Sequence, residues 1–250
     1  MKIKTISEQD IINLNIEHKQ VIKWVKEAFL AKKNSSLPAK ISQTFEEGAK
    51  FFNTMPAIMF DENVYGVKVV SRYPDRNPAI KADILLYDLK TGGHLAILDG
   101  TWITAARIGA VAALAVEELA KQNYENIAVM GLGATGQNFL KAWLSKSSNK
   151  SKKVKLLNYK DHAIKTKEML LKEGVSQVEI CNDNENLIRD SDVVVSAITV
   201  ANELIGKDDW FKPGVLVVPI HTRGFQNCDL FFEQVVCDDV SHVEGFKNFS

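Results

Sequence analysis

The sequence has little cysteine, and its three cysteines, Cys181, Cys228 and Cys237, form no CxxC pair. Structural zinc sites need closely spaced cysteine or histidine ligands, so we expect no bound metal. Secreted disulfide-stabilised domains need several paired cysteines. The cysteine content therefore indicates a protein of a reducing compartment.

Long apolar runs are absent as well. The sequence has no stretch of about 18 apolar residues, the length that crosses a bilayer. Residues 1–15 also lack the apolar centre of a signal peptide. We therefore expect a cytoplasmic protein with no membrane contact.

Neither sign of charge is in excess, because 31 basic residues balance 31 acidic ones. A net charge of zero argues against a nucleic-acid partner and favours a small ligand. The 250 residues, 46% hydrophobic and 25% charged, have an ordinary globular composition. This length fits one large domain or two modest ones.

The first half of the chain predicts an antiparallel sheet with a helix packed on it. Ser7–Asp10 resembles a capping box before a short helix, and residues 18–33 have apolar side chains at helical spacing. Thr101–Gln122 is a long, mostly apolar helix that Thr101 or Thr104 could cap. The expected strands are 40–45, 51–59, 65–71, 83–87 and 95–98, with a hairpin turn at 90–93.

Beyond residue 122 the pattern changes to alternating apolar strands and helices, as in a doubly wound (Rossmann-type) α/β domain with a parallel sheet. The domain boundary is therefore expected near residue 122. The expected strands are 127–130, 154–157, 178–180, 193–197, 215–218 and 235–237.

A glycine-rich fingerprint, GLGATG, directly follows the strand that ends at Met130 and opens a helix over residues 137–144. In this context the motif predicts a dinucleotide-binding turn, with the pyrophosphate at the helix N-terminus. The expected roles are a tight turn at Gly131, close approach of the cofactor at Gly133 and close helix packing at Gly136. The predicted cofactor-binding residues of this loop are Gly131, Gly133, Ala134, Thr135 and Gly136.

The end of the second strand distinguishes NAD from NADP, because an acidic residue there binds the ribose 2′-hydroxyl. The aligned position is Asn158, which is neutral, and Lys160 follows it; Asp161 is instead a candidate helix cap. The cofactor is therefore predicted to be NAD or NADP, with a lean towards NADP. Ala197 and Thr199, at the end of a later strand, are expected to border the cofactor.

Two cations occupy apolar surroundings in the first half. Lys68 interrupts the strand GVKVV, and Arg107 lies within the alanine-rich helix. A buried charge needs a partner, so both indicate an anionic ligand, such as a carboxylate held in an arginine fork. The alternative is an edge-strand lysine and an arginine paired with a neighbouring acid.

Several motifs in order resemble the ornithine cyclodeaminase/mu-crystallin family: Met55–Pro56, Gly66–Ser71, Asn77–Pro78, Thr91–Gly100, Thr104–Arg107, Gly131–Ala134 and Asp192–Ala197. The resemblance implies NAD(P)-dependent homodimers that act on amino or imino acids. It implies that Lys68 and Arg107 bind the substrate, with Lys40 near the position of a family arginine and Met55 in the same site.

The loop after the fifth strand departs from the family pattern. Cyclodeaminases have an aspartate there, whereas this loop has His221, Thr222 and Arg223; Asp229 comes later. His221 is therefore a candidate for proton transfer, or else for a structural hydrogen bond. Three functions stay open: an oxidoreductase acting on the C–N bond of an amino or imino acid, an ornithine cyclodeaminase, and a non-catalytic NADPH-binding protein like mu-crystallin.

The resemblance also makes 250 residues short. We expect a substrate-binding and dimerisation domain over residues 1–122, a dinucleotide-binding domain over 123–240 and the start of a return segment over 241–250. The family's C-terminal segment would then be lacking. We expect either a truncated product or a compact variant that covers its exposed apolar surface by oligomerising.

Overall fold

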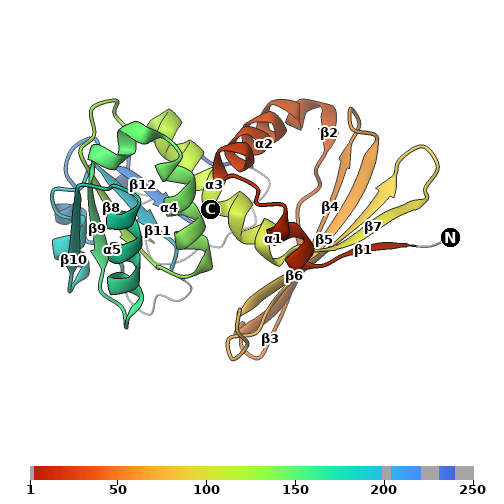
Figure 1. The fold of residues 1–250 in the computed structure, drawn as a ribbon, viewed down its shortest axis with the longest axis horizontal. Helices are drawn as coiled ribbons and strands as arrows, with labels where there is room; N and C mark the ends of the chain where they lie inside the picture. Colours follow the sequence, from red (N-terminus) through yellow and green to blue (C-terminus); the bar gives the residue numbers. More distant parts are fainter. Residues whose placement is uncertain (1–2, 199–203, 221–230, 240–250) are drawn as a thin grey trace. The chain divides into compact units, whose positions relative to one another are not determined.

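The computed structural model describes residues 3–198, 204–220 and 231–239 (Figure 1). It divides into two compact units, residues 1–105 and 106–250, and the division falls inside helix α3 (Thr101–Leu119). The boundary near residue 122, at the end of this helix, stays a prediction about the functional domains.

Unit 1 contains one sheet of seven strands in the order β1-β7-β6-β5-β4-β2, with β3 also paired to β4. Every pairing is antiparallel except that of β1 with β7. The predicted sheet and helices are present. Strands β1 and β2 were not predicted, because strands of three and two residues are too short to show an alternation of apolar and polar side chains. The strands are β1 (Lys4–Ile6), β2 (Ser35–Ser36), β3 (Ile41–Phe45), β4 (Lys50–Met59), β5 (Val64–Arg72), β6 (Ile80–Asp88) and β7 (His94–Asp99), and the helices are α1 (Glu8–Asn13), α2 (His18–Ala31) and the short 3-10 helix η1 (Lys32–Asn34).

Local polar contacts set the ends of these elements. The predicted capping box is formed, because Ser7 Oγ accepts from the Asp10 N–H and the Asp10 carboxylate accepts from the Ser7 N–H. The predicted β6–β7 turn is also formed, with the Asp88 carboxylate accepting from the N–H and the hydroxyl of Thr91, each at 2.8 Å.

The start of α3 differs from the prediction. Neither Thr101 nor Thr104 caps it; instead the N–H of Thr101 donates to Oδ1 of Asp99 at 2.8 Å. The expected burial is confirmed in the later turns, where Ala106, Ala110, Ala113 and other residues are buried. An aspartate before the first turn satisfies an N–H that has no intrahelical acceptor, and it favours the positive end of the helix.

Register separates the two faces of the unit 1 sheet. One face presents the row Met55, Lys68, Ile84 and Leu98, in which each residue is paired directly with the next. The opposite face presents the row Pro56, Val67, Leu85 and Ile97, which is apolar and only half-buried. Unit 1 therefore has an apolar sheet face that is partly open to solvent, as the sequence analysis expected.

Unit 2 is the predicted doubly wound domain. Its five strands are all parallel, in the order β10-β9-β8-β11-β12, and Figure 1 shows α4 and α5 running alongside them. The strands are β8 (Asn126–Met130), β9 (Lys153–Leu157), β10 (Gln177–Cys181), β11 (Val193–Ser196) and β12 (Leu216–Pro219); the helices are α4 (Ala134–Leu144), α5 (His162–Lys172) and α6 (Asn184–Ile188), with short 3-10 helices η2 (Ser147–Ser151) and η3 (Asp208–Trp210). The continuously apolar runs of β8 and β11 are fully buried, which is why they alternate so little.

One predicted strand of this domain is wrong. Residues 235–237 form no strand, and Val235 and Val236 are 57% and 69% exposed. A short run of β-branched residues favours extended backbone, but a strand also needs a neighbour to pair with. In the part of the chain that the structure describes, the sheet ends at β12.

Candidate functional site

The glycine-rich loop lies where the strand order reverses, between β8 and β11. Gly131 has φ +81°, and a Cβ there would lie 2.3 Å from the carbonyl carbon of Ala197. A Cβ on Gly136 would lie 2.1 Å from the carbonyl oxygen of Gly131. The loop therefore requires glycine at both positions, for a left-handed turn and for close packing.

Gly133 differs, because a Cβ there would meet nothing within 4 Å. The protein leaves open space in front of this backbone, where the fingerprint would place a pyrophosphate. Gly133 is also the N-cap of α4 and supplies no side-chain cap. The N–H groups of Ala134, Thr135 and Gly136 have no intrahelical acceptor, so the positive end of α4 is available to an anion. The loop thus fits the phosphates of a dinucleotide.

The other predicted cofactor residues lie at the same edge of the sheet. Gly131, Asn158 and Ala197 each directly follow a strand, respectively β8, β9 and β11. The N–H of Ala197 donates to the carbonyl of Met130 at 2.8 Å, which joins two of these strand ends. The structure therefore brings these three residues to one edge, while Thr199 lies outside the described residues.

The end of β9 has no carboxylate ready for a ribose hydroxyl. The side chain of Asn158 is exposed and donates to Oδ1 of Asn182 at 3.1 Å. Asp161 is at the N-cap position of α5, but it makes no capping hydrogen bond, contrary to the prediction. Its carboxylate is bound by Lys165, which lowers the pKa of Asp161.

Lys160 and the exposed Tyr159 follow Asn158 at this strand end. The Lys160 Nζ lies 5.2 Å from the centroid of the Tyr159 ring, which is 58% exposed. Tyr159 is not among the predicted cofactor residues, although an aromatic residue close behind the second strand of this fold is a signal that the sequence contains. A cation and an aromatic face are thus available beside the ribose end of the site.

The predicted substrate residues of unit 1 share one neighbourhood. Met55 is paired directly with Lys68 on the same face of the sheet. Lys40 immediately precedes the first β3–β4 pair, Ile41 with Thr54, so it lies at the Met55 end of that ladder. The structure therefore groups Lys40, Met55 and Lys68, and their role in substrate binding stays a prediction.

Arg107 belongs to unit 2. Its Nε is buried, and no described residue accepts a hydrogen bond from it. Burial lowers the pKa of Arg107, and the charge of Asp238 acts in the opposite direction. A guanidinium keeps its charge in proteins, so a buried N–H that no described residue accepts is available to an anionic group. Whether Lys68 and Arg107 meet in one site stays a prediction.

The loop that carries His221 lies outside the described residues, with Thr222, Arg223 and Asp229.

Over residues 3–198, 204–220 and 231–239, no helix is long and apolar enough to cross a membrane. Within these same ranges no group of three or more histidine, cysteine or acidic residues could hold a metal ion.

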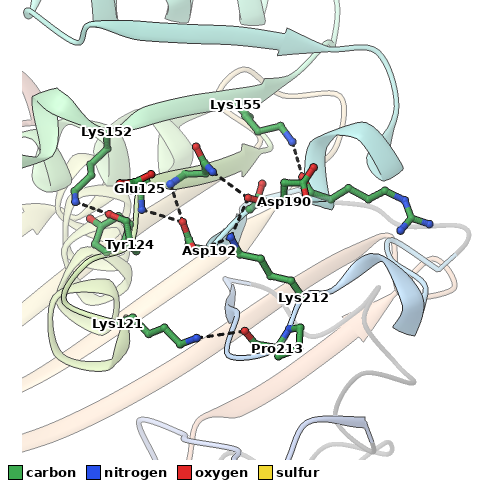
Figure 2. A network of polar contacts seen from close by, with 12 residues as sticks. Lys121, Tyr124, Glu125, Lys152, Lys155, Asp190, Asp192, Lys212 and Pro213 are labelled. Atoms are coloured by element: carbon green, nitrogen blue, oxygen red, sulfur yellow. Dashed lines mark hydrogen bonds and ion pairs between the residues drawn. The ribbon is translucent and has the colours of Figure 1, made fainter.

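At the opposite edge of the sheet, Asp192 links the beginnings of several strands (Figure 2). Its Oδ2 accepts from the N–H groups of Glu125 and Asn126, both at 2.9 Å, and its Oδ1 pairs with Lys212 Nζ at 2.7 Å. Partial burial raises the pKa of Asp192, but the hydrogen bonds from Lys212 and the two N–H groups outweigh it and leave the pKa below its ordinary value. This contact fixes β8 and β11, the strands that present the cofactor loop at their other ends.

The parallel sheet, its switch point and the open glycine cradle together give unit 2 the fold and the loop geometry of Rossmann-type dinucleotide-binding domains. Comparison with known proteins identifies a family for the chain. The model of the ornithine cyclodeaminase/mu-crystallin family matches residues 3–234, and the chain belongs to this family.

Relatives with assigned names are distant in sequence. Rat ketimine reductase mu-crystallin is 29% identical over 66% of this chain and 52% of its own length. The nodulation efficiency protein NfeD of Rhizobium meliloti is 23% identical over 98% of this chain and 77% of its own. The chain thus spans about half the length of its mu-crystallin relatives.

Solved structures show the same fold. The Δ1-pyrroline-2-carboxylate reductase of Thermococcus litoralis, in complex with NADH and L-proline, is 28% identical, with a TM-score of 0.77 over 87% of this chain and 68% of its own. An archaeal alanine dehydrogenase dimer with bound NAD is 24% identical, with a TM-score of 0.76 over 87% of this chain and 67% of its own.

Proposed function

We propose that the protein is an NAD(P)-dependent oxidoreductase that acts on the C–N bond of an amino or imino acid. The observation that carries this proposal is the glycine cradle, closed to any side chain at Gly131 and Gly136 but open in front of Gly133. Family membership and the likeness to a reductase that binds NADH and L-proline support the same chemistry.

The chain's own residues would bind and orient the two reactants. Gly133 and the first N–H groups of α4 would hold the pyrophosphate, and Ala197 and Thr199 would border the cofactor. When bound, NAD(P)H supplies the hydride that reduces the α-carbon. Arg107 would hold the substrate carboxylate, using the buried Nε that no described residue satisfies.

The remaining predicted residues would act around the C–N bond. Lys68 would contact the carboxylate or polarise the reacting C–N group, with Met55 and Lys40 beside it on the sheet. His221 would transfer the proton that accompanies reduction of the imine nitrogen.

We propose NADP(H) as the preferred cofactor. The support is the ribose end of the site, where Asn158 is neutral and Asp161 is engaged by Lys165. Lys160 would favour a 2′-phosphate over a hydroxyl. Comparing turnover with the two cofactors tests this preference, and a strong preference for NADH would overturn it.

We further propose that the protein is a cytoplasmic homodimer. Its half-buried apolar sheet face, the row Pro56, Val67, Leu85 and Ile97, supports an isologous interface. The archaeal alanine dehydrogenase of the same fold is a dimer.

The experiment follows absorbance at the nicotinamide band with Δ1-pyrroline-2-carboxylate and other cyclic imino acids as substrates. We expect NADPH to be consumed, and we expect Arg107→Leu to lower kcat/KM by about 100-fold, as for loss of a charge-assisted fork. Lys146→Met, which removes an exposed cation of the same unit, is the matched control and should leave kcat/KM unchanged.

Other outcomes point to the alternatives. Ammonia release from ornithine without a net absorbance change would identify a cyclodeaminase. Tight NADPH binding with no turnover of any substrate would identify a non-catalytic protein like mu-crystallin. Unchanged kinetics in Arg107→Leu would refute the carboxylate clamp.

A further inference from the structure

A cavity of about 300 Å³ opens at the amino edge of the unit 2 sheet. It lies near Asn126 and Lys153, the first residues of β8 and β9, and near Asp190, which precedes β11. The glycine-rich loop is at the other end of these strands. The cavity is therefore separate from the dinucleotide site.

Lys155 forms part of the cavity wall although it is only 7% exposed. It lies on the face of the sheet that Ala128 and Val194 share, and both of these are fully buried. Its Nζ donates to the carbonyl of Arg189 at 2.8 Å, and Figure 2 shows it reaching the turn that holds Asp190. Among the described residues no carboxylate lies within ion-pair distance of it, although Glu179, its cross-strand neighbour on β10, acts on it electrostatically. Its hydrogen bond to the Arg189 carbonyl is to a neutral acceptor.

The other cations of the wall are already neutralised. Lys153 pairs with Glu179 at 2.6 Å, and Arg189 pairs with Glu185 at 2.6 Å and with Asp209 at 3.0 Å. Lys155 has three N–H donors and uses one of them on the Arg189 carbonyl. Its other two N–H donors bind no described residue, so they are available to a ligand.

An acid with an available carboxylate also lines the cavity. The backbone carbonyl of Asp190 accepts from Asn126 Nδ2 at 3.1 Å and from Lys212 Nζ at 3.2 Å. Its side-chain carboxylate forms no hydrogen bond or ion pair with the residues that the structure describes. Asp190 is exposed, so solvent hydrates this carboxylate and leaves it able to accept an ammonium group.

We propose that this cavity binds a free α-amino acid as a zwitterion, with its carboxylate on Lys155 and its ammonium on Asp190. A simple cation would add positive charge beside the buried Lys155 ammonium, whereas a zwitterion offers it a carboxylate and places its own ammonium beside the exposed Asp190 carboxylate. Water takes about 30 Å³ per molecule, so the cavity has room for a small amino acid. This site does not depend on the proposed reaction.

Calorimetric titration with glycine tests the proposal on the full chain carrying Arg107→Leu, which removes the proposed substrate clamp. We expect saturable binding of glycine, and binding of acetate and of methylammonium that is at least about tenfold weaker. Lys155→Met and Asp190→Asn should each weaken glycine binding about tenfold, as loss of a charged hydrogen bond does. Lys165→Met, on the exposed α5 surface, is the matched control and should bind glycine normally.

Three results would overturn the proposal: no glycine binding, equal binding of acetate and glycine, or full affinity in both cavity variants. If Lys155→Met fails to fold, Asp190→Asn decides alone. Asp190 has φ +62°, which asparagine tolerates, so this variant should keep the wild-type melting temperature. Because the titration uses neither cofactor nor turnover, its failure is distinguishable from failure of the proposed reaction.

Discussion

Replacing Asp192 by asparagine is expected to destabilise unit 2 through the beginnings of its central strands. The carboxylate receives two backbone N–H groups on Oδ2 and the Lys212 ammonium on Oδ1. An asparagine has one acceptor oxygen, so its NH₂ group must face either the two N–H donors or the ammonium. Either orientation places donors against donors in a partly buried position.

The size of the effect follows from these contacts. Hydrogen bonds to a charged group contribute about 1.5–3 kcal/mol each, and leaving buried donors unsatisfied costs a similar amount. The Lys212 side chain is 36% exposed, so solvent screens its share. We therefore expect Asp192→Asn to lower the free energy of unfolding by about 2–3 kcal/mol at neutral pH.

The effect should depend on pH in one direction. The pKa of Asp192 is lowered in the folded protein, so its carboxylate stabilises the fold above the ordinary aspartate pKa of 3.8. This contribution is lost as the pH falls through the lowered pKa and the carboxylate becomes protonated. The difference between wild type and Asp192→Asn should therefore be full at pH 7 and shrink below about pH 4.

Urea denaturation followed by circular dichroism, at a series of pH values, measures this difference. Asp208→Asn is the matched control, because Asp208 is exposed in η3 and should give a change of less than about 0.5 kcal/mol. An Asp192→Asn protein as stable as the control at pH 7 would refute the reasoning. So would a difference that stays constant down to pH 3.

Two further predictions concern the cofactor loop and the open sheet face. Gly131→Ala should destabilise the protein and abolish NADPH binding, because Gly131 has a positive φ and lies against the Ala197 backbone. Gly133→Ala should keep the wild-type melting temperature and lose only affinity for the cofactor. Equal melting temperatures of the two variants would contradict this, as measured by thermal unfolding and fluorescence titration. Leu85→Asp should convert the proposed dimer to a monomer by size-exclusion chromatography with light scattering, whereas the exposed Lys81→Asp should not; a dimeric Leu85→Asp protein would exclude this face.

Periodicity and glycine placement predicted most of the nucleotide domain. The apolar runs at 127–130 and 193–197 are continuous because both faces of a parallel strand are covered, and this covering is a property of the fold class. The spacing of Gly131, Gly133 and Gly136 likewise follows from backbone geometry, which a sequence motif states directly.

The wrong predictions concern features that the path of the folded backbone decides. The run at 235–237 has the composition of a strand but forms none in the described sheet, because pairing and not propensity makes a strand. Thr101 or Thr104 was the predicted cap of α3, whereas the carboxylate of Asp99 accepts a hydrogen bond from the N–H of Thr101, the first residue of the helix. Which of several polar residues caps a helix depends on how the chain enters it.

The low cysteine content and balanced charge on their own predicted a protein without a structural metal and with a small ligand, since composition limits which partners a surface can bind. The motifs also selected Lys68 and Arg107 as unusual, because a cation among apolar residues stands out in any sequence. Only the tertiary structure decided that Met55 and Lys68 are paired neighbours and that the Arg107 Nε is buried with no acceptor among the described residues. Burial and the pairing of particular residues depend on contacts between elements that are distant in sequence, and composition does not specify these contacts.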